Sequence, residues 1–300
     1  MNFREEQKRK TERIEAVIEK YLPRQEGFQK TLMEAMSYSV RSKGKRLRPM
    51  LMEESFRLFG GSTEVIEPFM AALEMIHNYS LVHDDLPAMD NDEYRRGRKT
   101  TWVEYGEGMA VLAGDGLLNL AFETAAGAFR FASDFAASGR IAQALQILGN
   151  KAGIFGMIGG QTADIEAESG EREMTQELVL FIHEKKTAAL IQAAMMIGAV
   201  LAGASKEAVD RMEKAAANIG IAFQIQDDIL DVTSTTEILG KPVGSDEKNH
   251  KLTYVTMNGI EKAKEEVRRL SEEALGILNS FEYKNEFLCE LVRSLINREK

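Results

Sequence analysis

The chain has 300 residues, of which 44% are hydrophobic and 28% charged, a globular composition that excludes fibrous, collagen-like and disordered proteins. Its 38 Lys and Arg against 47 Asp and Glu give a formal net charge of −9, which argues against nucleic-acid binding because phosphate affinity needs a basic face. The single cysteine, Cys289, cannot form an internal disulfide and favours a reducing, cytoplasmic location.

Helices are predicted along the whole chain. Apolar residues recur at helical spacing in 14–21, 212–223 and 270–278, and strand alternation with hairpin turn signals is missing. The chain has five prolines where average usage would give about fifteen. None of them lies between residues 88 and 241. We therefore predict one all-α domain over residues 1–300, a bundle of ten or more helices.

The most apolar segment, 187–203, is predicted to be a buried core helix. It contains Gln192 and is short for a membrane span of about 20 residues, so we expect no stable membrane insertion. Residues 1–19 are too charged for a signal peptide. Loops are expected at 41–48, 86–100, 167–174 and 233–251.

The strongest chemical signal is the pair Asp84 and Asp85, followed by Asp90. Pro87 disfavours helical geometry at the residue before it, so a helix should end near Leu86. The pair then lies at the negative end of the helix dipole, and Asp90 can fold back toward it from the next loop. Such crowding of carboxylates is unfavourable unless a cation is bound.

A second cluster contains Asp227, Asp228 and Asp231, with Gln224 on the same helix face as Asp227 and Asp231. Mg²⁺ takes oxygen ligands and typically bridges protein carboxylates to substrate phosphates. Two such clusters facing each other could hold several metal ions with a diphosphate between them. A solvated acidic helix end is the alternative for either pair alone.

Basic segments accompany both clusters, as a diphosphate ligand would require. They are 44–49, 95–99, Lys185–Lys186 and the lysines at 241, 248 and 251. Arginine binds phosphate through a planar fork and lysine as a point charge. His77 lies about two helical turns before Asp84 and could donate to a phosphate. Each basic run alone would ordinarily be a solvated surface.

The sequence resembles the trans-isoprenyl diphosphate synthases, or polyprenyl synthetases, and within them the bacterial farnesyl diphosphate synthases. The segments that carry the likeness are 44–49, 76–87, 90–97, 106–115, 160–161 with Asp164, 186–187, 223–231, and 240–241 with Gly244 and Asp246. They occur in the family's order over most of the chain. The resemblance implies an all-α prenyltransferase of the isoprenoid synthase type, with a central cavity among its helices and a homodimeric state.

The resemblance also implies the site residues. About three Mg²⁺ ions, with Mn²⁺ as an alternative, would be bound through carboxylates and would assist ionisation. Their ligands would be Asp84, Asp85, Asp90, Asp227, Asp228 and Asp231. The allylic diphosphate would bind Arg95, Lys186 and Lys241, with Thr187 and Gln224 beside the allylic cation. Isopentenyl diphosphate would bind Lys45, Arg48, His77 and Arg96, and the basic tail residues Arg298 and Lys300 would help to close the site.

The implied reaction condenses isopentenyl diphosphate with dimethylallyl or geranyl diphosphate by ionisation, condensation and proton elimination. In the family an aromatic residue five positions before the first aspartate accompanies a C15 product, and here that residue is Tyr79. Ideal helix geometry instead favours Ser80, which lies about 40° from Asp84 while Tyr79 lies about 140° away. We expect Tyr79 to set the length and farnesyl diphosphate to be the product.

Other interpretations stay open. A geranylgeranyl diphosphate synthase (C20) is the nearest, and a terpene cyclase or a non-catalytic subunit is less consistent with the paired, intact motifs. A di-iron carboxylate bundle would use the motif Glu-x-x-His on two helices. The chain contains this motif twice, at Glu74 with His77 and at Glu247 with His250. Four residues depart from the family's common pattern and put local loop geometry in question. Trp102 stands where histidine is frequent, Lys99 replaces a usual proline, Asn91 interrupts an acidic run, and Ala188 stands where glycine is common.

Overall fold

A computed structural model describes residues 2–42, 44–233 and 252–296. Regular structure in these residues is almost entirely helical, which confirms the prediction of an all-α protein with ten or more helices. Packing divides the chain into two compact units, Met1–Glu53 with Ser62–Leu145, and Glu54–Gly61 with Gln146–Lys300. That residues 1–300 form a single domain stays a prediction.

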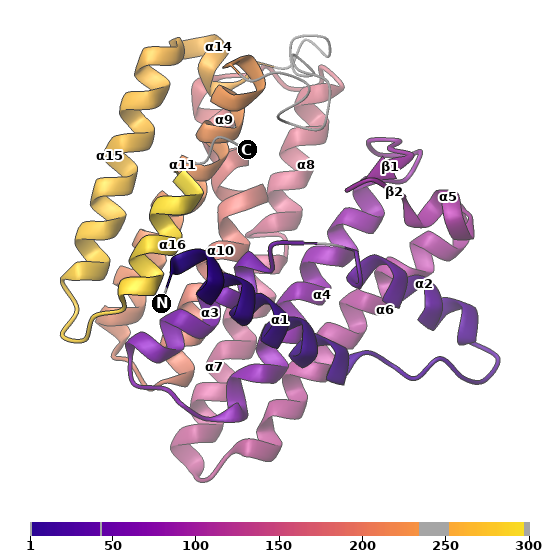
Figure 1. The fold of residues 1–300 in the computed structure, drawn as a ribbon. Helices are drawn as coiled ribbons and strands as arrows, with labels where there is room; N and C mark the ends of the chain where they lie inside the picture. The colour runs from indigo at the N-terminus through magenta and orange to yellow at the C-terminus, as the bar shows by residue number, and fades with distance from the viewer. Residues whose placement is uncertain (1, 43, 234–251, 297–300) are drawn as a thin grey trace. The chain divides into compact units, whose positions relative to one another are not determined.

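The first unit is built around α4, which packs along α6 (Figure 1). Its elements are α1 (Phe3–Tyr21), α2 (Lys30–Val40), η1 (Glu64–Ile66), α4 (Glu67–Asp84), β1 (Tyr94–Arg95), β2 (Arg98–Lys99), α5 (Thr101–Tyr105), α6 (Glu107–Ala126) and η2 (Gly127–Phe131). Helices α3 (Leu47–Leu58) and α7 (Phe135–Ala152) carry residues of both units.

Helix α4 is buried along most of its length, so its neighbours fix where it ends. At Gly114 of α6 a Cβ atom would lie 2.0 Å from Nε2 of His83, so only glycine allows this approach. His83 Nε2 lies 3.1 Å from the carbonyl oxygen of Val111, a hydrogen bond between the two helices. The last turn of α4 is therefore held against α6.

The hairpin β1–β2 is a feature that the sequence analysis missed. Tyr94 pairs with Lys99 and Arg95 with Arg98 in an antiparallel register. The two turn residues, Arg96 (φ 53°) and Gly97 (φ 76°), both adopt positive φ, as a type I′ turn requires. An arginine at the first turn position replaces the usual Asn or Asp, which is why the hairpin signal was absent.

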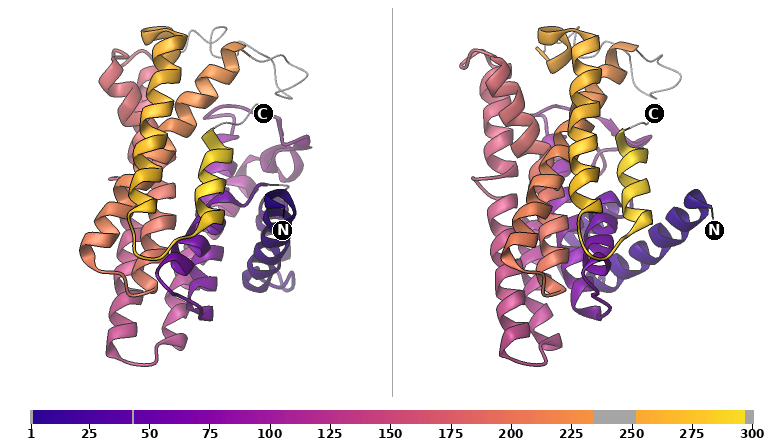
Figure 2. Two further views of the ribbon diagram at one scale, coloured as in Figure 1. Left: turned by 60° about the vertical axis from the view of Figure 1, so that its left-hand side comes forward. Right: turned by 90° about the vertical axis from the view of Figure 1, so that its left-hand side faces the viewer.

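The second unit contains α8 (Met157–Glu168), α9 (Gln176–Ile182), the π-helix η3 (His183–Ala188), α10 (Ala189–Leu201), α11 (Lys206–Thr233), α14 (Tyr254–Asn258), α15 (Ile260–Asn279) and α16 (Glu286–Ile296). Every residue of α10 is buried, which confirms the prediction of a core helix. Helix α11 packs against α10 and α15, and Figure 2 shows α15, in gold, beside α16, in yellow. None of the described helices combines the length and apolar character that a bilayer crossing requires.

Candidate active site

The first aspartate cluster forms where α4 ends. Asp84 is the last residue of the helix, and Asp85 caps it with helical geometry. The loop then folds back, because the backbone N–H of Asp90 donates to the carbonyl oxygen of Asp84 over 2.8 Å. The cluster therefore occupies one turn at the negative end of a helix dipole, which favours a bound cation.

Asp85 is tied to the hairpin by an ion pair. Nε of Arg95 donates to Oδ1 of Asp85 over 2.7 Å, and Nη2 of Arg95 lies 3.5 Å from Oδ2 of Asp92. Burial raises the pKa of Asp85 to about 6, Arg95 lowers it, and the charges of Asp92 and Asp90 raise it further. Carboxylates are thus crowded around a single arginine.

A basic cluster lies near the middle of α4. His77 and Arg48 are half-buried, and Arg96 comes from the hairpin turn. Burial lowers the pKa of His77 well below its usual value, and the charges of Arg48 and Arg96 lower it further. Burial also lowers the pKa of Arg48 to about 10, with Glu74 opposing and Arg96 adding to the shift. This crowding of cations favours an anionic ligand.

The donors of this cluster are only partly satisfied. Nε of Arg48 is buried and makes no hydrogen bond within the described part of the chain. A buried donor without a partner costs free energy, which a bound phosphate oxygen would recover. Lys45, the other cation predicted here, is exposed on the connection before α3.

Arg46 has a structural role. Its side chain is 4% exposed and donates to Glu74 over 2.8 Å and to the carbonyl oxygen of Val40 over 2.8 Å. Glu74 is therefore bound to an arginine, which weighs against its use as an iron ligand. The second Glu-x-x-His string, at residues 247–250, lies outside the described residues.

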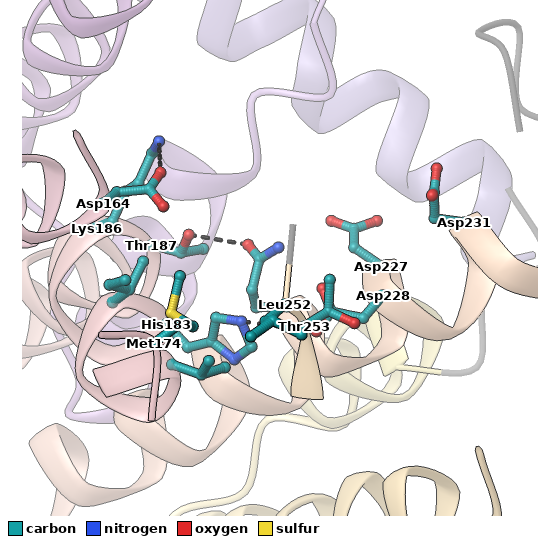
Figure 3. A pocket seen from close by; sticks show the side chains of 13 residues that line it. Asp164, Met174, His183, Lys186, Thr187, Asp227, Asp228, Asp231, Leu252 and Thr253 are labelled. Carbon is teal, nitrogen blue, oxygen red and sulfur yellow. Dashed lines mark hydrogen bonds and ion pairs between the residues drawn. The ribbon is translucent and has the colours of Figure 1, made fainter. Parts of the chain in front are cut away.

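The second aspartate cluster lines a pocket of about 230 Å³ in the second unit (Figure 3). Of the residues predicted for the site, this pocket brings together Lys186, Thr187, Gln224, Asp227, Asp228 and Asp231. Nζ of Lys186 lies 2.6 Å from Oδ2 of Asp164, and the Thr187 hydroxyl donates to Oε1 of Gln224 over 3.0 Å. An ammonium group, a hydroxyl and several carboxylates thus share one concave surface.

The π-helix η3 presents Lys186 and Thr187 to this pocket. π-turns are rare in proteins, and those that do occur are often found at functional sites. Its position depends on Gly160 of α8, where a Cβ atom would lie 2.1 Å from the backbone nitrogen of Lys186. Helix α8 therefore contacts the backbone of the turn directly.

The sequence analysis missed His183 and gave Asp164 no role. Nε2 of His183 lies 3.7 Å from Oδ2 of Asp228, which also accepts from the backbone N–H of Tyr254 over 3.1 Å. A signal for His183 was available, because it precedes Lys186 and Thr187 by three and four residues, the spacing of one helix face.

The donor chemistry of both clusters fits a hard divalent cation. Within 2–42, 44–233 and 252–296, no group of three or more His, Cys, Asp and Glu side chains is gathered closely enough to hold a metal ion. Mg²⁺ does not need such a group, because it keeps several waters and usually binds one or two carboxylates together with substrate phosphates. The all-oxygen aspartate sets are consistent with magnesium that arrives with a diphosphate.

Tyr79 and Ser80 differ in what their side chains do. Tyr79 is 6% exposed, and its ring packs edge-on against His83 with 5.8 Å between centroids. The Tyr79 hydroxyl is buried and has no hydrogen-bond partner among the described residues. The Ser80 hydroxyl donates to the carbonyl oxygen of His77 over 2.9 Å and so returns to its own helix. Lys241, Arg298 and Lys300 lie outside the described residues.

A family model described as polyprenyl synthetase matches residues 29–291. The chain belongs to the polyprenyl synthetase family. It is 39% identical over 282 residues to a farnesyl diphosphate synthase of Geobacillus stearothermophilus, with 93% of each chain covered. It is 41% identical to a geranylgeranyl diphosphate synthase of Cyanophora paradoxa, covering 95% of this chain and 93% of that one.

A solved structure gives the same assignment. The geranyltransferase of Helicobacter pylori, crystallised with magnesium and isoprenyl diphosphate, superposes with a TM-score of 0.82 at 31% identity. The superposition covers 99% of this chain and 97% of that one. The polyprenyl synthetase fold therefore extends over nearly the whole protein.

Proposed function

We propose that this polyprenyl synthetase condenses isopentenyl diphosphate with dimethylallyl and geranyl diphosphate to make farnesyl diphosphate. The chain is a prenyltransferase by family, and the proposal adds its substrates, its residues and its product length. One observation carries most weight: Lys186, Thr187 and the aspartates of α11 line a single pocket. A diphosphate needs such a combination of cation and metal-binding carboxylates.

In this proposal the basic cluster of the first unit binds isopentenyl diphosphate without metal. Arg48 and Arg96 supply charge, and exposed Lys45 adds a third cation. His77 is neutral because its pKa is lowered, so it contributes a hydrogen bond rather than a charge. The Nε of Arg48, which has no hydrogen-bond partner among the described residues, is the donor that the diphosphate would satisfy.

The allylic diphosphate is held at the aspartates. Asp84, Asp85, Asp90, Asp227, Asp228 and Asp231 are the proposed magnesium ligands. Arg95, Lys186 and Lys241 add fixed positive charge around the departing diphosphate. When bound, Mg²⁺ neutralises the charge on that leaving group. Lys186 is paired with Asp164 in the described structure, so it must exchange or share that partner when substrate binds.

The chemistry needs no protein nucleophile. The allylic C–O bond breaks, and the double bond of isopentenyl diphosphate attacks the resulting cation. We assign the stabilisation of that cation to the oxygens of Thr187 and Gln224, which are hydrogen-bonded to each other over 3.0 Å. The attack leaves a tertiary cation on the former isopentenyl unit. A carbon beside this cation then loses a proton to the released diphosphate, and the electrons of the broken C–H bond form the new double bond. Water must be excluded, because it would trap the cation.

The test is incubation with labelled isopentenyl diphosphate and each allylic diphosphate, with and without Mg²⁺, followed by product chromatography. We expect condensation only with the metal and a C15 main product. Absence of any condensation in Mg²⁺ would overturn the proposal. A main product of C20 would keep prenyl transfer and favour the geranylgeranyl alternative.

We also propose a cytoplasmic homodimer. Helix α6 and the segment after it expose apolar side chains that a second copy would cover. They are Val111, Leu112, Phe122 and Phe129, each between 36% and 53% exposed. Apolar side chains grouped on one helix typically mark an interaction surface.

A further inference from the structure

The hairpin β1–β2 is too short to hold its own position. Each strand has two residues, and an isolated two-stranded hairpin is marginal in water. Arg95 and Arg96, two cations of the proposed site, belong to it. Contacts from outside the hairpin must therefore decide where these two side chains lie.

The base of the hairpin is held by Trp102. Its indole Nε1 donates to the carbonyl oxygen of Asp92 over 2.9 Å, and the Thr100 hydroxyl donates to the same oxygen over 2.8 Å. The backbone N–H of Thr100 donates to the backbone carbonyl oxygen of Glu93 over 2.9 Å. Trp102 belongs to α5, so this helix is anchored to Asp92, two residues before the first strand of the hairpin.

The returning strand is held by Tyr38 of α2. The phenol hydroxyl donates to the carbonyl oxygen of Lys99 over 2.8 Å, and the guanidinium carbon of Arg98 lies 4.2 Å from the ring centroid. The Tyr38 ring also packs edge-on against Tyr105 of α5, with 5.5 Å between centroids. One side chain thus contacts both residues of β2 and helix α5.

The front of the hairpin tolerates little displacement. Arg95 is bound to Asp85, and the Arg96 guanidinium lies so close to Gly44 that a Cβ atom there would be 2.8 Å from Nη1. A small tilt of the hairpin would break the Arg95–Asp85 ion pair and move the Arg96 guanidinium away from Gly44.

We propose that Tyr38 and Trp102 are positioning residues that hold the hairpin so that Arg95 and Arg96 meet the substrate diphosphates. This inference rests on the proposed function for the role of the two arginines. The positioning role also accounts for tryptophan at position 102, because its indole N–H donates the hydrogen bond that anchors the segment before the hairpin.

Hydrogen–deuterium exchange tests the bracing without any turnover. The variants are Tyr38→Phe, which removes one hydroxyl, Tyr38→Leu, which also removes the ring, and Trp102→Phe, which removes the N–H. Tyr94→Phe is the matched control. This tyrosine belongs to the same hairpin and is 64% exposed, and its hydroxyl makes no hydrogen bond with any residue that the structure describes. We expect exchange over residues 93–100 to rise about fivefold in Tyr38→Phe and Trp102→Phe, the order expected for one lost hydrogen bond. Tyr38→Leu should exceed both, and exchange in α6 should stay unchanged.

Kinetics test the positioning role. We expect KM for isopentenyl diphosphate, which Arg96 binds in the proposed function, to rise about three- to tenfold in Tyr38→Phe and Trp102→Phe. The fall in kcat should be smaller than the rise in KM, because Arg95 keeps its ion pair with Asp85. Tyr94→Phe should match the parent in both measurements. Parental exchange and parental KM in both single-bond variants would overturn the inference, as would an equal loss of kcat and melting temperature with KM unchanged. If the parent makes no product, the proposed function fails, while the exchange measurement still decides the bracing.

Discussion

His77 is a histidine surrounded by arginines, and its environment determines its charge. Burial and the charges of Arg48 and Arg96 hold its pKa well below the usual value of 6.5. The folded protein therefore keeps His77 neutral in a range where the unfolded chain binds a proton. The stability that this group contributes is present above about pH 6.5 and is lost as the pH falls below it.

This linkage gives a prediction for His77→Asn. The free energy of unfolding of the parent should fall as the pH drops from 7 to 5, and that of the variant should fall less. Urea unfolding of both proteins at these two pH values measures the difference. Equal losses in the two proteins would show that His77 does not stay neutral in the folded state.

Tyr79 is the residue for which sequence geometry and family likeness disagreed. The structure buries its phenol against His83 and returns the Ser80 hydroxyl to its own helix. Of the two, only Tyr79 has a large, buried side chain whose truncation would leave a void. This supports Tyr79 as the residue that limits product length, in the proposed function.

The prediction for Tyr79→Ala is a shift of the main product from C15 toward C20. The deletion leaves a void that would cost about 3–5 kcal/mol if it stayed empty, and a longer isoprenoid chain would fill it. Chromatography of the dephosphorylated products measures the shift. Tyr79→Phe keeps the ring and should still give C15. If Tyr79→Ala made only C15, the length limit would lie elsewhere.

At the scale of elements, the close contact between α8 and η3 determines where Lys186 lies. A Cβ at Gly160 would meet backbone atoms, at 2.1 Å from the nitrogen of Lys186 and 2.6 Å from the carbonyl carbon of Lys185. Backbone cannot swing away as a side chain can. Any larger residue at Gly160 must therefore separate the two elements.

We predict that Gly160→Ala lowers the free energy of unfolding by about 1–3 kcal/mol, the usual range for overpacking. It should also raise KM for the allylic substrate by displacing Lys186. The control is Gly139→Ala in α7, where a Cβ meets nothing within 4 Å and where alanine should stabilise by about 0.5–1 kcal/mol. Urea unfolding compares the three proteins. Parental stability in Gly160→Ala would contradict the contact.

The helices were predictable from the sequence because strong local signals mark them. Pro23 follows α1 and Pro87 follows α4. The loop expected at 167–174 covers most of the connection between α8 and α9, although α8 extends to Glu168. The hairpin was not predictable, since its turn is Arg-Gly and its strands are too short to alternate. The π-helix was missed because apolar periodicity is read at 3.6 residues per turn, and one wide turn changes that period only locally.

At the scale of the whole molecule, the site residues were predictable as types and only partly as an arrangement. Spacing along α11 placed Gln224, Asp227 and Asp231 on one face, and all three line the pocket. Asp164 and His183 also line this pocket, but they come from α8 and η3, so only the fold brings them beside α11. The structure pairs the internal Arg46 with Glu74 over 2.8 Å and with Glu15 over 3.6 Å. The buried Nε atoms of Arg46 and Arg48 both have no hydrogen-bond partner among the described residues, and only that of Arg46 lies beside a carboxylate in an ion pair found there.

The apolar side chains of α6 lead to a prediction about assembly. Val111 and Phe122 lie three helical turns apart on one face and are 41% and 36% exposed. Light scattering after gel filtration should give twice the mass of one chain. Val111→Asp with Phe122→Asp should give monomer, because charges on an apolar interface are left unpaired. Tyr283→Asp, at an exposed position of the other unit, should leave the dimer intact. A monomeric parent would contradict the prediction.

The π-helix has a consequence for how this segment tolerates length changes. Because a π-turn bonds i to i+5, it accommodates one residue more than an α-helical turn in the same space. Deleting one residue between His183 and Ala188 would let the turn close as ordinary α-helix with α9 and α10 continuous. Because the wide turn absorbs the extra residue, the side chains of α9 and α10 on either side would keep their orientation, and only side chains within His183–Ala188 would change position. Insertions and deletions here would change which side chains enter the pocket without unfolding the bundle, so this turn is a point where specificity can change by length alone.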